Sequence, residues 1–519
     1  MQPRRIALLL GAAAAVAVAG TAAAPGARSG HAAPAATPKR GGHITIARIE
    51  DSNSFDKTNV FQNESIWLAE QIMEPLYIVA NDGKTLKPWL ATSYKAAKNG
   101  KTYTFKLRQG VKFSNGKPMT AADVKFSIDD ARAQKKGWGY LDAAIKSIDA
   151  PNPSTVVIHL KFQWAPFLAD IALFANGIVP KNFNGEPRAK FYTHPVGTGP
   201  FMWDSRVVGQ SVSLKRNPYY WQKGKPYLDG VTWTFVTDEN TRELQLRGGQ
   251  IQVDEFPPFN SIDKLKKTPG VTMSLFPSTR TDYLDMNELY PPLKDRHVRR
   301  AISYAIDRQS IVKSVLFTYG KPANSQLPPQ VPFYDKHAGG LQYDLAKAKA
   351  EMAKSKYPKG FKVQILVGAG AQVEQTIGQI LQQALKQLGI VATFKQEDTS
   401  TEFNDINAFK YQLAFSYWTM DIADPDELVT FALDPKGGAF SFYTHYNNPT
   451  VTKLSHEAQR EVNVPKRAKL YARIQRLAAR DANLGYLYYS PYRWAYSSKL
   501  HGFFVQPLGN YHLEDAWLG

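Results

Sequence analysis

The chain has 519 residues, a formal net charge of +19, and a composition of 43% hydrophobic and 21% charged residues. These values are ordinary for a folded protein and the length predicts two or three domains, which excludes intrinsic disorder and a single small domain. The sequence contains no cysteine. Disulfides, thiolate metal sites, thiol nucleophiles and a lipidated N-terminal cysteine are therefore excluded.

The first 36 residues have the pattern of a signal peptide followed by a linker of small residues. Arg4 and Arg5 precede an apolar run at residues 6–19, and small residues continue to Ala36. The run is shorter than the roughly 20 residues that span a bilayer. We expect removal of the signal and release of a soluble protein into the periplasm, not a lipoprotein. The twin arginine leaves the export route open.

Strand patterns dominate the first half of the mature chain. Residues 43–49 alternate apolar and polar side chains, and strands are expected at residues 102–107 and 111–114 around a glycine turn. Thr120 followed by Asp123 is a capping box, which predicts a helix to residue 131. Further strand-like stretches lie at residues 154–162, 211–221, 230–236 and 270–276, and helical patterns at residues 66–73, 165–173 and 238–247.

Helices and strands alternate in the second half. Helical patterns occupy residues 295–316, 344–355 and 375–389, and strand patterns occupy residues 361–368, 391–398 and 411–418. Strand, helix and strand with short links predict a βαβ unit on a largely parallel sheet. The stretch at residues 483–505, near the C-terminus, again has strand patterns.

This order predicts an α/β protein with two lobes, mixed sheets and a ligand cleft between the lobes. Domain I is expected at residues 37–285, with an inserted subdomain at about residues 76–195. Domain II, an α/β domain, is expected at residues 286–490, and residues 491–519 return to domain I. Domain I would then be discontinuous.

No catalytic or cofactor motif is present. The chain has no His-Glu-x-x-His, no Gly-x-Ser-x-Gly and no nucleotide-binding glycine motif after a strand, and its ten histidines lack paired ligand spacing. We therefore expect a binding protein without catalytic residues, metal or cofactor. An exported hydrolase would need a nucleophile and base that the sequence does not offer.

The stretch "SYWTMDIADPDELV" places four carboxylates after the strand at residues 411–418. Asp424 before a proline fits a helix N-cap, and Asp426 and Glu427 fit the first turn, where the helix dipole favours acids. Asp421 has no such structural role. It is either a solvated loop residue or a ligand contact beside Trp418, at the strand end where clefts of open α/β sheets lie.

Several stretches, in the same order along the mature chain, resemble the family 5 extracellular solute-binding proteins of ABC importers, the peptide and nickel class. They are "IMEPLY", "GKTYTFKLRQGVKFSNGKPMTAADVKFSI", "PVGTGPF", "LKRNPYYW", "DRHVRRAISYAIDRQSIV" and "YDLAKAKAEM". The resemblance implies a type II periplasmic binding fold with an extra subdomain that closes around its ligand.

The resemblance also implies roles for residues at the end of the strand. In peptide-binding members, an Asp shortly after a Trp binds the α-amine of the ligand, and "YWTMD" matches with Trp418 and Asp421. The Trp418 ring is expected to line a side-chain pocket, and the backbone at Thr419 to pair with the ligand.

One expected feature is missing. Dipeptide-specific members carry an arginine for the ligand carboxylate before the helix at residues 375–389, but "LVGAGAQVEQ" has no basic residue. Arg280 is a candidate replacement, although it also fits a surface arginine. Four further candidates lie in segments expected to face the cleft: Ser54, Phe55, Tyr283 and Tyr489.

The resulting hypothesis is a monomeric periplasmic protein that delivers a peptide or peptide-like solute to the permease subunits of an ABC transporter. Binding of a nickel complex, haem or another non-peptide solute remains an alternative, because the fold does not fix the ligand. A basic exported protein that binds envelope polyanions is an alternative from another class. No nucleic-acid partner is expected.

Overall fold

A computed structural model describes residues 37–134, 137–436 and 441–519. The predicted signal peptide at residues 1–36 lies outside these residues. Within these three ranges, no helix has both the length and the apolar character needed to cross a membrane.

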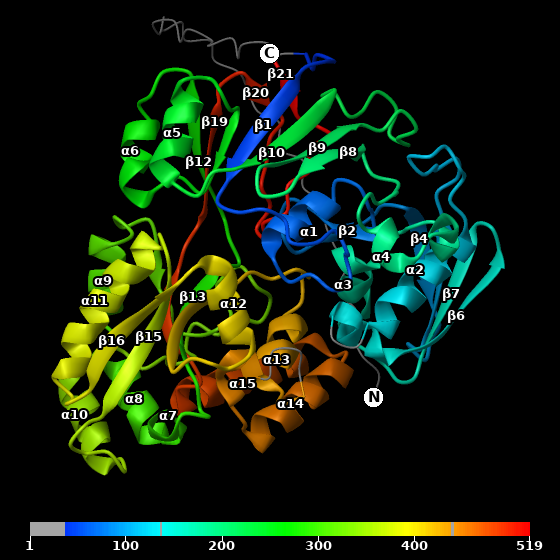
Figure 1. Cartoon of the computed structure of the whole chain (residues 1–519). Coiled ribbons are helices and arrows are strands. Elements are labelled where there is room, and N and C mark those ends of the chain that lie inside the picture. Colours follow the sequence, from blue (N-terminus) through cyan, green and yellow to red (C-terminus); the bar gives the residue numbers. More distant parts are fainter. Residues whose placement is uncertain (1–36, 135–136, 437–440) are drawn as a thin grey trace, which may run out of the picture. The chain divides into compact units, whose positions relative to one another are not determined.

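The first sheet has seven strands in the order β12-β19-β11-β1-β10-β9-β8. The bounds are β1 His43–Arg48, β8 Phe201–Val207, β9 Ser211–Arg216, β10 Gly230–Phe235, β11 Val253–Glu255, β12 Val271–Phe276 and β19 Tyr492–Ser497. Strand β1 runs parallel to β10 and β11, whereas the other pairs are antiparallel. Strand β19, from the end of the chain, lies between β11 and β12, and Figure 1 shows it beside β12.

The second sheet has six strands in the order β14-β18-β13-β17-β15-β16. The bounds are β13 Thr281–Met286, β14 Lys321–Pro322, β15 Lys362–Gly368, β16 Val391–Glu397, β17 Leu413–Trp418 and β18 Gly485–Tyr489. Strand β15 is parallel to both β16 and β17, as the βαβ pattern predicts. The pairs of β13 with β17 and β18, and of β14 with β18, are antiparallel, so only half of this sheet is parallel.

A third, antiparallel sheet has the order β4-β5-β7-β6, and two small sheets pair β2 with β3 and β20 with β21. The bounds are β2 Tyr77–Val79, β3 Leu86–Pro88, β4 Ala91–Ala96, β5 Thr102–Leu107, β6 Ile145–Asn152, β7 Thr155–Leu160, β20 Leu500–His501 and β21 Trp517–Leu518. The predicted strand at residues 111–114 is wrong. That stretch forms only an isolated bridge, from Lys112 to Pro118 across a glycine turn.

The helices expected from the sequence are present with two differences, whereas the helices Pro449–Arg460 and Val464–Asp481 were not predicted. The capping box is present: the Thr120 N–H and hydroxyl both donate to Asp123 Oδ2, at 2.8 and 2.7 Å. The pattern at residues 295–316 is two helices, because Asp307 accepts the Ser310 N–H at 3.0 Å and caps a new start. Asp424 is not itself the N-cap; the helix begins one residue later than expected, after Pro425.

The helices have these bounds: α1 Asn63–Ala69, α2 Ala121–Ala133, α3 Phe167–Ile171, α4 Arg188–Phe191, α5 Glu239–Arg247, α6 Ile262–Leu265, α7 Pro291–Lys294, α8 Arg296–Ala305, α9 Arg308–Ser314, α10 Leu345–Lys354, α11 Gln372–Lys386, α12 Thr399–Asn407, α13 Asp426–Leu433, α14 Pro449–Arg460 and α15 Val464–Asp481. Helix α11 packs on β15 and β16, and α14 packs on α13 and α15. These contacts attach the helices of the second half to the second sheet and to one another (Figure 1).

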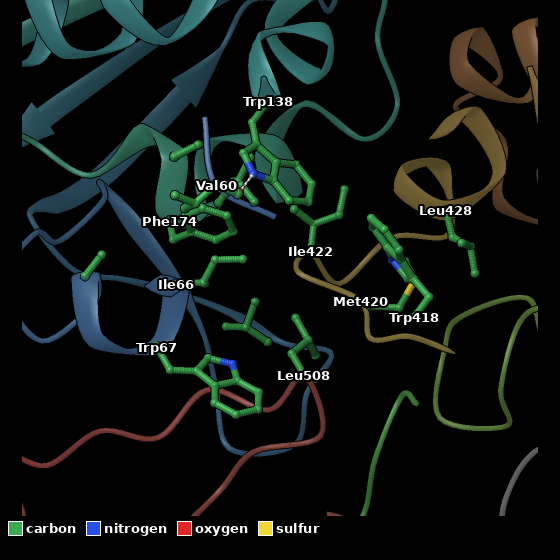
Figure 2. Packing of buried hydrophobic residues seen from close by; sticks show 14 of the residues in the cluster. Val60, Ile66, Trp67, Trp138, Phe174, Trp418, Met420, Ile422, Leu428 and Leu508 are labelled. Carbon is green, nitrogen blue, oxygen red and sulfur yellow. Dashed lines mark hydrogen bonds between the residues drawn. The ribbon is translucent and has the colours of Figure 1, made fainter. Parts of the chain in front are cut away.

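The largest core joins stretches that are far apart in sequence. Figure 2 shows Ile66 and Trp67 of α1, Trp138, Phe174, Leu508 and the stretch around Trp418 and Ile422 within one cluster. The Trp138 indole also donates a hydrogen bond to the Val60 carbonyl at 2.6 Å. Burial of these large side chains, at about 25 cal/mol per Å², holds the loop after β17 against the N-terminal part of the chain.

The chain passes between the first and second sheets twice. Residues 277–280 lead from β12 to β13, and residues 490–491 lead from β18 to β19. Strand β13 lies before the predicted domain boundary at residue 285 but pairs within the second sheet. The predicted domain limits stay a prediction.

Candidate functional site

The loop after β17 is organised by one carboxylate from the first turn of α13. The Trp418 indole donates to Glu427 Oε1 at 2.8 Å, and the N–H groups of Asp421 and Ile422 donate to Glu427 Oε2 at 2.7 and 2.8 Å. Burial raises the pKa of Glu427 to about 7, against the opposing effect of these hydrogen bonds. Glu427 therefore fixes the backbone of this loop as well as occupying the helix start.

Asp421 is 6% exposed. Its Oδ1 has no hydrogen-bond partner within the described ranges. Burial is the main cause that raises the pKa of Asp421 well above its ordinary value, followed by the charges of Glu427 and Glu70 and by a side-chain hydrogen bond with Glu427. An unpartnered, buried carboxyl oxygen is costly unless a ligand or water supplies a donor.

Asp421 lines a small cavity of about 20 Å³, which has room for about one water molecule. The polar side chains that also line it include Glu70, Glu74, Gln506 and Asn510. Neither lysine nor arginine is among the lining residues. The cavity is therefore rich in hydrogen-bond acceptors and has no cationic side chain of lysine or arginine to neutralise them.

Two glutamates of this cavity have different surroundings. Glu74 accepts hydrogen bonds from Trp89 at 2.7 Å, Thr198 at 2.7 Å, Tyr220 at 3.1 Å and Trp221 at 3.2 Å. Glu70 accepts one, from Asn510 Nδ2 at 2.7 Å, and its Oε2 has no partner in the part of the chain that the structure describes. Burial raises the pKa of Glu74 to about 7 and that of Glu70 to about 8.

The neighbours of Asp421 in sequence have mainly structural contacts. The Trp418 ring packs 4.5 Å from Phe431 and 6.4 Å from Trp138, centroid to centroid, and does not line the Asp421 cavity. The Thr419 hydroxyl lies 3.2 Å from Asn63 Nδ2. The predicted pocket wall at Trp418 and backbone pairing at Thr419 stay predictions.

Arg280, the predicted carboxylate ligand, already has a carboxylate partner. Its Nη2 donates to Asp282 at 2.7 Å, and its guanidinium carbon lies 3.7 Å from the centre of the Tyr417 ring. The Asp282 carboxylate and the face of the Tyr417 ring already interact with the guanidinium. Arg280 is therefore less suited to bind a carboxylate of the ligand than the sequence suggests.

Arg493 of β19, which the sequence analysis did not select, has no such partner. Its Nε donates to the Pro257 carbonyl at 2.8 Å, and its guanidinium carbon lies 3.8 Å from the centre of the Phe259 ring. No carboxylate lies within 4.0 Å of it among the described residues. Burial and the charge of Arg280 lower the pKa of Arg493 to about 10. No motif marks it, since it is one arginine on a strand.

The other four predicted residues lie away from the Asp421 cavity. Tyr283 is fully buried in β13 and donates to the Gln326 carbonyl at 3.2 Å. The Tyr489 hydroxyl lies 2.8 Å from the Ser325 carbonyl.

The remaining two belong to the segment before α1. The Phe55 ring packs edge-on to Trp203 at 4.9 Å, and Ser54 Oγ accepts the Asp56 N–H at 3.1 Å. Of the predicted residues, Trp418, Thr419 and Asp421 follow one another at the end of β17, Tyr283 and Tyr489 lie on the paired strands β13 and β18, and Asp421 alone lines the cavity. Ligand contacts at Tyr283, Tyr489, Phe55 and Ser54 stay predictions.

In the described portion of the molecule, no three histidine, aspartate or glutamate side chains are grouped so that they could hold a metal ion. The site that the geometry supports is therefore one of carboxylate and amide oxygens around a small cavity. Such a site suits a cationic group that donates hydrogen bonds.

Comparisons with known proteins concern the family and the fold of the chain. The family of bacterial extracellular solute-binding proteins, family 5 (middle region), matches residues 85–440. The Escherichia coli (strain K12) protein named "Probable D,D-dipeptide-binding periplasmic protein DdpA" is 30% identical over 489 residues, which cover 91% of this chain and 93% of DdpA. The glutathione-binding protein GsiB of Escherichia coli (strain 536) is 29% identical, with 91% and 94% covered.

Solved structures have the same fold. The periplasmic binding protein DppA of Helicobacter pylori, associated with an ABC transporter and solved with the peptide STSA, gives a TM-score of 0.85 at 25% identity. The match covers 92% of this chain and 98% of DppA. The predicted α/β fold of periplasmic binding proteins is thereby confirmed. The chain belongs to the family 5 bacterial extracellular solute-binding proteins.

Proposed function

We propose that this protein is the periplasmic binding component of an ABC importer and that it holds a peptide or peptide-like solute by the free amine of the solute. The observation that carries this proposal is Asp421, a buried carboxyl at the end of β17 with an unpartnered oxygen in a cavity that lacks lysine and arginine. An ammonium group supplies both the charge and the donors that this oxygen lacks.

The relatives support this class of solute. DdpA is named for D,D-dipeptides, GsiB for glutathione, and DppA was solved with a tetrapeptide. We propose that the solute is bound between the two lobes and passed unchanged to permease subunits. The absence of cysteine supports a protein that is free in the periplasm rather than lipid-anchored.

The test is a binding panel on the purified protein. Tetra-alanine, D-alanyl-D-alanine and glutathione are compared with their N-acetylated forms by native mass spectrometry and isothermal titration calorimetry. Acetylation removes the ammonium charge, and loss of a charge-assisted hydrogen bond of about 1.5–3 kcal/mol lowers affinity by about 10- to 100-fold. Asp421→Asn is expected to lower the affinity for the free-amine form by a similar factor.

Glu402→Gln is the matched control. Glu402 of α12 is a half-buried carboxyl whose pKa burial raises to about 7, and it does not line the Asp421 cavity. This variant should bind as the wild type does. Equal binding of free and acetylated forms would show that the amine role of Asp421 is wrong, and failure of every peptide to bind would refute a peptide solute.

A further inference from the structure

Four buried oxygen atoms around the Asp421 cavity lack a hydrogen-bond donor in the described part of the chain. They are Glu70 Oε2, Asp421 Oδ1, Gln506 Oε1 and Asn510 Oδ1, and their residues all line the cavity. The side chains of Gln506 and Asn510 are 2% and 7% exposed. Each such acceptor costs about 1–3 kcal/mol. Four of them at one place indicate that donors from water or from a ligand complete this cavity.

One side-chain hydrogen bond joins two of these four residues. Asn510 Nδ2 donates to Glu70 Oε1 at 2.7 Å, which leaves Asn510 Oδ1 as the unpartnered atom. Gln71, next to Glu70, donates to the Tyr511 carbonyl at 2.7 Å. The end of α1 is thereby tied to the loop that carries Gln506 and Asn510.

The loop that carries Asp421 is also joined, through Thr279, to the loop that carries Gln506 and Asn510. The Met420 N–H donates to Thr279 Oγ1 at 3.0 Å, and the Thr279 N–H donates to the Pro507 carbonyl at 2.8 Å. None of these bonds uses the four unpartnered oxygens. The three segments that carry the acceptors are therefore joined to one another without using these oxygens, and such pre-organisation lowers the entropic cost of binding.

Donors are scarce at this cavity. Glu74 already accepts hydrogen bonds from four side chains, so it adds negative charge but needs no further donor. Glu514 adds another carboxyl to the lining, 3.9 Å from His512 Nδ1. His512 Nε2 is also unpartnered, and its tautomer decides whether it donates or accepts.

We propose that Glu70 acts with Asp421 as a second carboxylate ligand, and that the two, with the amide oxygens of Gln506 and Asn510, form a cradle for one primary ammonium group. This rests on the proposed function and extends it, because it assigns specificity for –NH3+ to residues on three separate segments. A primary ammonium carries one positive charge and three N–H donors, and it is close to a water molecule in size.

The geometry also predicts which amines are rejected. The cavity is small, with space for about one water molecule, so extra methyl groups on the nitrogen would require the lining side chains to move. Methylation also removes donors: an N,N-dimethyl ammonium keeps one N–H group, so three of the four oxygens would stay unpartnered, against one with the primary ammonium. N,N-dimethylated and N-acetylated amines should both bind at least about tenfold more weakly than the primary amine.

The experiment uses the full mature protein and two kinds of probe. Tetra-alanine, its N,N-dimethyl form and its N-acetyl form are titrated by calorimetry into the wild type, Glu70→Gln, Asp421→Asn and the control Glu402→Gln. Thermal unfolding is also measured with methylammonium, tetramethylammonium and potassium chlorides at equal concentration. Circular dichroism and a cooperative unfolding transition verify that each variant is folded, and Glu70→Asp retains the charge if Glu70→Gln does not fold.

We expect Glu70→Gln to lower tetra-alanine affinity by about tenfold or more and to reduce the preference for the primary amine, as Asp421→Asn does. Wild-type affinity in Glu70→Gln would overturn the two-carboxylate cradle while leaving the proposed function intact. If tetra-alanine does not bind the wild type, methylammonium decides: stabilisation above tetramethylammonium and potassium that is lost in Glu70→Gln supports the cradle. Equal effects of the three salts would overturn it, and a potassium effect alone would identify a metal-ion site instead.

Discussion

Four acids within seven residues make four different sets of contacts. Glu427 accepts the Trp418 indole and two backbone N–H groups, and Asp424 forms an ion pair with Arg467 at 2.5 Å. Asp426 accepts the Thr430 hydroxyl at 3.1 Å. Asp421 alone among them has an unpartnered carboxyl oxygen within the described residues. At the scale of single residues, a carboxyl oxygen without a hydrogen-bond partner distinguishes an acid that can contact a ligand from acids whose role is structural.

The same criterion applied to the arginines favours Arg493 over Arg280 as the partner of an anionic group on the solute. Arg493→Gln is expected to lower the affinity for tetra-alanine by about 10- to 100-fold, because a charge-assisted hydrogen bond of about 1.5–3 kcal/mol is lost. C-terminally amidated tetra-alanine, which lacks the carboxylate, should bind both proteins alike. Calorimetric titration measures both, and Arg280→Gln is the comparison variant. An equal loss for the amidated peptide would contradict a carboxylate contact.

At the scale of elements, the start of α13 is joined to α15 by a buried ion pair. Both Asp424 oxygens contact Arg467 of α15, and Asp424 Oδ1 also accepts the Asp426 N–H at 2.9 Å. Arg467 also donates to the Ala458 carbonyl at the end of α14. This ion pair joins the start of α13 to α15 through residues that lie 43 positions apart in the sequence.

Asp424→Asn should destabilise the protein without changing amine selectivity. Removing one partner leaves Arg467 buried with its charge uncompensated, and such changes cost about 3–5 kcal/mol. Urea denaturation measures the loss, and the ratio of affinities for free and acetylated tetra-alanine should stay that of the wild type. Asp421→Asn is expected to show the reverse, a changed ratio with a smaller loss of stability. A changed ratio in Asp424→Asn would mean that the ion pair positions the amine site.

The sequence predicted best what depends on neighbouring residues. The strand at residues 102–107 and the capping box at Thr120 depend on local pattern, and both are present. The contact of Glu70 with Asn510 joins residues 440 positions apart, and no local pattern encodes it. Asp421 could be identified from the sequence because the other three acids of this stretch have a role at the start of the helix and Asp421 has none. The partnership of Arg280 with Asp282 could have been read from their spacing on one strand face.

At the scale of the whole molecule, many carboxyls are buried without a basic partner close enough to keep them ionised. Burial raises the pKa to about 8 for Glu70, Glu255 and Asp285 and to about 7 for Glu74 and Asp142. A folded state with raised carboxyl pKa values binds more protons than the unfolded state. The free energy of unfolding is therefore greatest at a pH below the carboxyl pKa values of the unfolded chain. It falls as the pH rises toward the raised pKa values of the folded protein.

We expect the ligand-free protein to have a higher free energy of unfolding near pH 5 than near pH 8, the window between the ordinary carboxyl pKa and the raised values. Asp285→Asn should flatten this dependence by up to about 1.4 kcal/mol per pH unit, because the amide does not titrate. Asp56→Asn is the control, since hydrogen bonds from Arg188 and Asn59 outweigh burial and lower the pKa of Asp56. Urea unfolding across this window measures the slopes, and a stability that rises with pH would contradict the expectation.

The position of β19 has a consequence for biosynthesis. Strand β12 pairs only with β19, and β19 also separates β12 from β11 in the first sheet. A nascent chain that has not yet emerged from the ribosome beyond residue 497 therefore cannot complete this sheet, although β1 and β8 to β12 have long been synthesised. The first sheet thus depends on a strand near the C-terminus, and a chain truncated before residue 492 lacks the strand that joins β12 to β11.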